Sequence, residues 1–122
     1  MAIAEFTSGT KLVDTNEWSI ADTSTANGET YSTATPLTDD GVFQLFLDLN
    51  DMIAGDELQI RVYEKCRSGD TQRIIYQCNL IGAQSPPTWV SPSLILLHGW
   101  DMTLDCIAGT SITVLWSIRR VS

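Results

Sequence analysis

Apolar and polar residues alternate along the C-terminal part of the chain, between Gly99 and Val121. The apolar residues share even numbers on both sides of a short turn: Trp100, Met102, Leu104, Cys106, Ile112, Val114, Trp116 and Ile118. Successive strand side chains point to opposite faces of a sheet, so this alternation predicts strands with one buried face. We expect a hairpin that turns at 108–110 and places Cys106 opposite Ile112 and Met102 opposite Trp116.

A second alternating stretch lies between Glu57 and Ile81. Its even-numbered apolar residues fall on both sides of Ser68-Gly69-Asp70: Leu58, Ile60, Val62, Cys66, Ile74, Tyr76, Cys78 and Leu80. These side chains lie on one face only if even-numbered residues pair with even-numbered residues. The two numbers of every pair then add to an even sum, and the loop between the strands must have an odd number of residues. The pattern therefore predicts a second hairpin, with the three-residue loop 68–70 and a glycine in its middle.

Shorter strands are expected elsewhere. Gly41–Leu49 alternates but also carries the off-phase Phe46, which favours a central strand or one at a subunit contact. Leu94–Leu97 is a short, fully apolar strand, and the proline-containing loop Gly82–Pro92 is expected to cross from one sheet to the other.

The first third of the chain has little to bury. It offers strand candidates at 2–7, ending at Ser8-Gly9, and at Thr30–Thr35, a polar edge strand stopped by Pro36. Residues 1–36 are therefore expected to form a polar N-terminal arm or a set of edge strands.

No run of ten residues has clean helical spacing. The sequence predicts a single all-β domain over residues 1–122, an antiparallel β-sandwich of seven to nine short strands that is jelly-roll-like. A length of 122 residues and an apolar fraction of 43% suit one such domain with its own core.

The charged residues are unevenly distributed along the chain. The net charge is −8, and residues 1–60 hold eleven acids and one base, whereas residues 61–122 hold six bases and four acids. An acidic chain is a poor match for nucleic acid, whose binding depends on neutralising phosphates. The asymmetry either reflects solvated surface or steers head-to-tail contact between identical subunits.

The cysteines and the N-terminus indicate a reducing compartment. Cys66, Cys78 and Cys106 cannot all pair within the chain and form no C-x-x-C motif, so we expect them to be buried, structural thiols. The N-terminus has no signal-peptide pattern, and no apolar run is long enough to cross a membrane. We therefore expect synthesis in a cytoplasm without secretion by a signal peptide.

Catalytic and metal motifs are weak. His98 is the chain's single histidine, and no acid or nucleophile can be assigned to it, so a structural histidine is favoured over a catalytic one. Acids at 48, 51, 56 and 57 resemble a calcium loop in composition, but their spacing does not fit an EF-hand, which favours solvated turns. We expect no enzyme activity, no cofactor and no metal.

Aromatic and basic residues supply the binding candidates. Trp18, Trp100 and Trp116 fall on core positions, so Trp89 in the proline-containing loop is the only tryptophan expected to be exposed. The predicted hairpin between Glu57 and Ile81, called here the middle hairpin, has four basic residues at its odd-numbered, outward-facing positions: Arg61, Lys65, Arg67 and Arg73. These bases form either a wet face with local pairs to Asp70 or a docking strip for an acidic neighbour.

The layout of the whole chain resembles small β-sandwich or jelly-roll decoration (cement) proteins of tailed bacteriophage capsids. The resemblance rests on the polar arm Met1–Pro36, the central strand Gly41–Leu49, the hairpin Glu57–Ile81 and the closing strand Ser111–Val121. It involves no diagnostic motif, and no functional residue is carried over.

The resemblance implies a virion structural protein that binds the assembled shell as an oligomer, favouring a homotrimer, with the major capsid protein or another virion protein as partner. Candidate interface residues from the arm and the central strand are Ile3, Phe6 and Phe46, beside the four bases and Trp89. Two alternatives remain: a carbohydrate- or receptor-binding jelly roll of the tail-fibre type, and a small jelly-roll enzyme built around His98.

Overall fold

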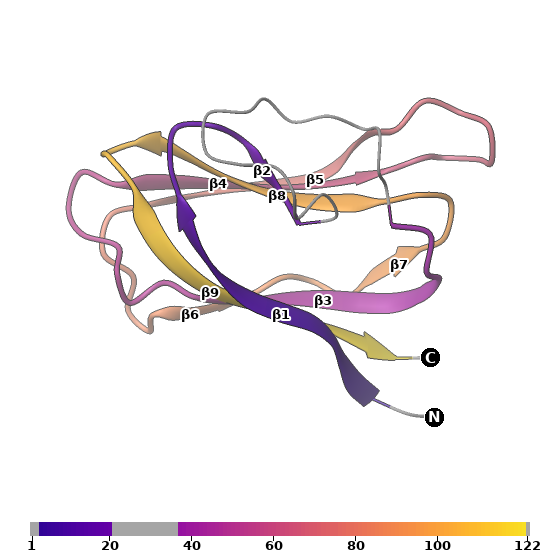
Figure 1. The fold of residues 1–122 in the computed structure, drawn as a ribbon, viewed down its shortest axis with the longest axis horizontal. Helices are drawn as coiled ribbons and strands as arrows, with labels where there is room; N and C mark the ends of the chain where they lie inside the picture. The colour runs from indigo at the N-terminus through magenta and orange to yellow at the C-terminus, as the bar shows by residue number, and fades with distance from the viewer. Residues whose placement is uncertain (1–2, 21–36, 122) are drawn as a thin grey trace.

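A computed structural model describes residues 3–20 and 37–121, which form nine strands in two antiparallel sheets packed face to face (Figure 1). The strands are β1 (Ile3–Val13), β2 (Trp18–Ser19), β3 (Gly41–Asp48), β4 (Glu57–Glu64), β5 (Arg73–Ile81), β6 (Thr88–Val90), β7 (Leu94–Leu96), β8 (Asp101–Ala108) and β9 (Ile112–Val121). The predicted all-β sandwich is confirmed.

The strand order is that of a jelly roll. One sheet, called here the β9 sheet, has the order β1-β9-β3-β6, with β7 also paired to β3; the other, the β4 sheet, has the order β2-β8-β4-β5. The first strand pairs with the last, the second with the next to last, β3 with β6 and β7, and β4 with β5. This nesting of antiparallel pairs, folded over into two sheets, defines the jelly roll.

The even-numbered apolar side chains of β4 and β9, with Met102, Leu104 and Cys106 of β8, meet between the sheets, as their alternation predicts. Trp100 is fully buried and lies against Phe43, with ring centroids 4.5 Å apart, while Trp18 and Trp116 pack at 5.7 Å. Such tilted aromatic contacts add to the free energy of burying the rings. All three of these tryptophans belong to the core, as expected.

The C-terminal hairpin prediction is wrong. β8 pairs with β2 and β4, whereas β9 pairs with β1 and β3, so the two strands lie in opposite sheets. Gly109, with φ +93°, lies in the connection that crosses between the sheets. Cys106 and Ile112 are both fully buried, because they face the same core from opposite sides instead of pairing within one sheet.

The middle hairpin is confirmed in register but not in its loop. Pairing runs from Glu57 with Ile81 to Val62 with Tyr76, with even sums as predicted. The register then shifts at a bulge, β4 ends at Glu64, and β5 begins only at Arg73. The connection is therefore residues 65–72, longer than the predicted loop 68–70.

The N-terminal segment is more regular than predicted. β1 does not end at Ser8-Gly9 but continues to Val13, paired to β9. Gly9 lies opposite Trp116, and a Cβ at this position would come within 3.1 Å of the indole ring. The glycine makes room for the ring instead of ending the strand. The edge strand predicted at Thr30–Thr35 lies outside the described residues.

Two further predictions are confirmed. β3 is a central strand, since it pairs with β9 on one side and with β6 and β7 on the other. The chain crosses from the β4 sheet to the β9 sheet after β5, although β6 begins within the predicted loop, at Thr88. Within 3–20 and 37–121 there is no helix with the length and apolar character needed to span a membrane.

Candidate functional site

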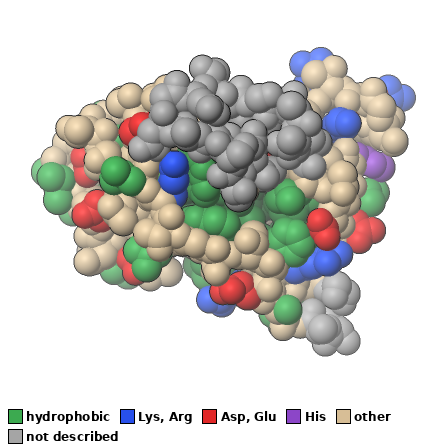
Figure 2. All heavy atoms as spheres, viewed as in Figure 1, with side chains coloured by type: hydrophobic (Ala, Val, Ile, Leu, Met, Phe, Trp, Pro, Cys, Tyr) green, Lys and Arg blue, Asp and Glu red, His purple; other side chains and the backbone are tan. Residues whose placement is uncertain are grey.

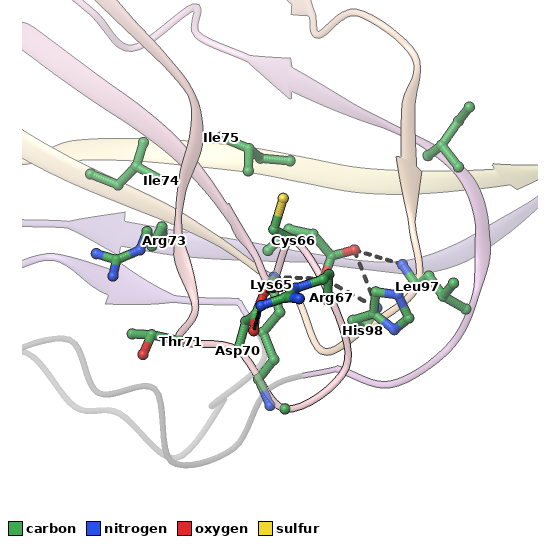
Figure 3. A pocket seen from close by; sticks show the side chains of 13 residues that line it. Lys65, Cys66, Arg67, Asp70, Thr71, Arg73, Ile74, Ile75, Leu97 and His98 are labelled. Carbon is green, nitrogen blue, oxygen red and sulfur yellow. Dashed lines mark hydrogen bonds and ion pairs between the residues drawn. The ribbon is translucent and has the colours of Figure 1, made fainter.

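A broad hollow of the described surface lies at one end of the sandwich, where the β4–β5 loop faces the corner between β7 and β8 (Figures 1 and 3). We call it the end cleft; its volume is about 870 Å³. Its walls come from residues 64–71, the start of β5 at 73–75, and residues 95–98. Two stretches that are separate in sequence, 64–75 and 95–98, thus share one surface.

Exposed aliphatic side chains form the apolar part of the end cleft. They are Ile74, Ile75, Ile95 and Leu97, and Ile95 is 82% exposed. A single exposed isoleucine is ordinary, but a group of four in one hollow is typical of an interaction site.

Basic groups surround these aliphatic residues. Lys65, Arg67 and Arg73 supply three of the chain's seven lysines and arginines, and the His98 ring lies at the same rim (Figure 3). The view of the whole surface likewise shows basic side chains and histidine at this end (Figure 2). Arg67 is bound to Asp70 through two hydrogen bonds of 3.0 and 3.2 Å. Among the described residues, Lys65 and Arg73 have no ion pair.

A buried carboxylate holds the end cleft in shape. Glu64 is only 8% exposed, and its oxygens accept hydrogen bonds from the backbone N–H groups of Leu97 at 2.6 Å, His98 at 3.1 Å and Lys65 at 2.9 Å. Charge-assisted bonds of this kind are stronger than neutral ones. Glu64 therefore ties the 97–98 corner to the β4–β5 loop and fixes two walls of the cleft.

The bulge on β5 explains why two adjacent isoleucines are exposed. Tyr76 pairs with Val62 and Ile74 with Tyr63, which leaves Ile75 as the extra residue. A bulge re-aims the residues beside it. The Ile74 side chain therefore lies on the surface of the end cleft, although its even number predicts that it faces the core.

The four predicted basic residues divide into two groups. Lys65, Arg67 and Arg73 lie together in the end cleft, but Arg61 does not. The Arg61 guanidinium donates to Gln77 at 3.1 Å and lies 3.6 Å from Glu17, on the outer face of the β4 sheet. The predicted strip is thus a cleft rim plus one separate, paired arginine.

Glu17 is the centre of a polar network on that outer face. One of its oxygens accepts hydrogen bonds from the hydroxyls of Tyr63 and Thr103, each at 2.6 Å. Burial, followed by the hydrogen bond to Glu17, raises the pKa of Tyr63 to about 12. Asp105 lies beside this network, and burial together with the charge of Glu17 raises its pKa.

The other predicted interface residues lie elsewhere. Phe46 and Ile3 line a small hollow of about 170 Å³ on the β9 sheet, where the Arg119 guanidinium stacks 3.6 Å above the Phe46 ring. Phe6 packs against Phe43 at 5.4 Å, as part of the core boundary.

Trp89 is not the exposed ring that the sequence predicts. It lies in β6, paired with Leu47, and its half-buried side chain packs against the core.

The acidic loop serves the local fold. Asp48 accepts from the Asn50 N–H, Asp51 from the Thr113 N–H at 2.8 Å, and Asp56 from the Ile53 N–H at 3.0 Å. The bonds of Asp48 and Asp56 are local turn bonds of the kind that aspartate makes with nearby backbone, whereas the Asp51 bond joins the loop to β9. Among the described residues, no three of the histidine, cysteine and acidic side chains are grouped to hold a metal.

Sequence reasoning missed the aliphatic part of the end cleft and the role of Glu64. Cys66, predicted to be buried, is exposed at the rim because β4 ends before it. A partial signal for Ile95 was present: successive side chains of Leu94–Leu97 point to opposite faces, so this fully apolar strand places apolar residues on the face away from the core as well. No family model, curated protein or solved structure matches this chain.

Proposed function

We propose that this protein is a structural protein that binds, as an oligomer, to the surface of a larger protein assembly of the phage capsid type. The observation that supports the proposal is the end cleft, where exposed aliphatic residues lie within a basic rim on an otherwise acidic chain. Burial of the aliphatic side chains supplies binding free energy, and the rim selects an acidic partner surface.

The charge distribution favours a protein partner with carboxylates. Lys65 and Arg73 have no ion pair among the described residues, so neither loses an ion pair with that part of the chain when it meets an acid on a partner. A protein that binds only the assembled shell stabilises that shell by mass action. This is the mechanism that we propose for its role as a decoration protein.

The glycan-binding alternative has less support. It needs an exposed aromatic platform, and Trp89, the ring assigned to that role, is half-buried against the core. Among the described residues, the lining of the end cleft includes aliphatic, basic and acidic side chains and the His98 ring at its rim, but no phenylalanine, tyrosine or tryptophan. Aliphatic residues bind protein surfaces well but do not provide the flat stacking face that sugars use.

The test is co-sedimentation with purified heads of the phage whose genome encodes this chain, stripped of accessory proteins. We expect the wild-type protein to sediment with the heads and Ile95→Lys to lose at least tenfold in affinity, because a charge would enter the apolar part of the cleft. Ile53→Lys is the matched control, since Ile53 is 66% exposed and lies in the β3–β4 loop, at the opposite end of the sandwich.

Heads that sediment without the wild-type protein overturn the proposed partner. Equal binding by Ile95→Lys and Ile53→Lys shows instead that the end cleft is not the docking surface.

A further inference from the structure

The β5 edge of the β4 sheet differs from the other sheet edges of the described chain. β1 carries a bulge between Glu5 and Thr7, the β6–β7 edge consists of two three-residue strands separated by Pro92, and β2 has two residues. Bulges, prolines and short length are the usual protections against edge-to-edge pairing. β5 has nine residues, and no described strand pairs with its outer side.

Beyond the bulge at Ile75, β5 has none of these protections. Residues 76–81 contain no charge, no proline and no glycine, and Ile81 is 72% exposed. Tyr76 and Leu80 are only partly buried, although both pack against the core. Because β5 is the outermost described strand of its sheet, another strand placed beside it would extend the core-facing surface of the sheet.

The sequence of this edge reads the same in both directions by chemical class. Residues 75–81 are Ile-Tyr-Gln-Cys-Asn-Leu-Ile, with Cys78 in the middle, an amide on each side of it, and large apolar residues beyond. Two antiparallel copies centred on Cys78 would place Tyr76 opposite Leu80 and Gln77 opposite Asn79. Apolar residues then meet apolar residues, and amides meet amides, at each position.

Side-chain contacts on the outer face provide charge complementarity in the same register. The Arg61 guanidinium donates to Gln77, the Gln77 amide donates to Asn79 at 3.4 Å, and Asn79 donates to Glu57 at 2.9 Å. When Asn79 lies opposite Gln77 of the second copy, a row of contacts runs from Glu57 through Asn79 of one copy to Gln77 and Arg61 of the other. Two-fold symmetry produces this row twice, and each row has an acid at one end and a base at the other.

From these observations we infer that β5 pairs with β5 of a second copy, antiparallel and about a two-fold axis at Cys78, to form one continuous eight-stranded sheet. The pairing uses backbone hydrogen bonds for affinity and the class-symmetric side chains for register. It produces a dimer, in contrast to the trimer that the family resemblance implies. The inference does not depend on the proposed function, because residues 76–81 are separate from the end cleft.

The register is tested with charge at two exposed positions. In Gln77→Glu/Asn79→Glu, two acids face each other at each symmetric pair, whereas in Gln77→Glu/Asn79→Lys each acid faces a lysine. We expect the first variant to raise the dimer dissociation constant roughly tenfold and the second to restore it to within about threefold of the wild type. Sedimentation equilibrium gives the constants, and thermal unfolding confirms that both variants are folded.

Cross-linking locates the axis. In a Cys66→Ser background, copper-phenanthroline oxidation should convert the two facing Cys78 thiols to a disulfide, with two protons and two electrons passing to the added oxidant. Directly opposed strand residues lie within disulfide range. Cys66→Ser/Cys78→Ser should give no covalent dimer. A wild-type protein that stays monomeric, a trimer, or a dimer that neither forms the Cys78 cross-link nor responds to the charge pair overturns the inference, whether or not the protein binds phage heads.

Discussion

Asp105 lies on β8, where its Oδ1 atom is buried without a hydrogen-bond partner among the described residues. Burial raises the pKa of Asp105 most, the charges of Glu17 and Asp14 raise it further, and Arg61 partly opposes them. A carboxyl whose pKa is higher in the folded than in the unfolded state destabilises the fold when ionised. This cost is present at neutral pH and disappears as the pH falls below the unfolded pKa.

We therefore predict that Asp105→Asn raises the free energy of unfolding at pH 7 by about 0.5–1 kcal/mol, a value discounted for the partial exposure of the side chain. Chemical denaturation at pH 7 and pH 3 measures the effect. At pH 3 the wild-type carboxyl is protonated, so the two proteins should have nearly equal stability. A stabilisation of the same size at both pH values would show that charge is not its cause.

Cys66 shows what a single residue in a pattern can conceal. Its even number continues the apolar phase of Leu58, Ile60 and Val62, which is why the sequence predicts a buried thiol. The strand ends at Glu64, however, and the carboxylate of this last residue accepts backbone hydrogen bonds from the 97–98 corner. Alternation predicts the face on which a side chain lies only within a strand, and the sequence contains no local signal for this long-range contact.

At the scale of the strands, the alternation of apolar and polar residues predicted which side chains are buried better than it predicted which strands pair. The even-numbered residues from Met102 to Cys106 on β8 and from Ile112 to Ile118 on β9 are buried as expected, yet the two strands belong to different sheets. A strand with one apolar face satisfies the same pattern whether its neighbour in sequence lies beside it or across the core. The β4–β5 register was predictable because those strands do pair, and the bulge at Ile75 was not, since it leaves the alternation of Tyr76, Cys78 and Leu80 intact.

The crossing between β8 and β9 yields a test of the corrected topology. Gly109 has φ +93°, and a Cβ there would overlap the buried Asp56 carboxylate that accepts the Ile53 N–H. Gly109→Ala should lower the free energy of unfolding by about 3 kcal/mol, because backbone strain and the displacement of Asp56 add together.

Gly55→Ala is the control for that substitution. Gly55 has the similar φ of +95°, but a Cβ there would meet nothing within 4 Å. It should cost about 1 kcal/mol from backbone strain alone. Urea denaturation of both variants separates the two contributions, and equal losses would contradict the packing of the crossing against the β3–β4 loop.

At the scale of the whole molecule, the end cleft could not be predicted from the sequence. Its basic rim was visible as Lys65, Arg67 and Arg73, but its aliphatic part combines Ile75 with Ile95, and only the jelly-roll path brings these strands to the same end. The pairing of chain ends was equally hidden. Residues 1–36 were expected to form an arm or edge strands, and β1 is an edge strand joined to β9 along its length.

This closure of the sandwich gives the last prediction. Val13 on β1 is fully buried and lies opposite Ile112, whereas the adjacent Leu12 is 48% exposed and lies opposite Thr113. If β1 is part of the core, Val13→Ala should lower the free energy of unfolding by about 2 kcal/mol, because it removes buried methyl groups and leaves a cavity. Leu12→Ala removes more carbon but should cost less than about 1 kcal/mol. A loosely attached arm would make both substitutions nearly neutral in thermal and urea unfolding, so the difference between two neighbouring residues decides whether the first strand closes the jelly roll in solution.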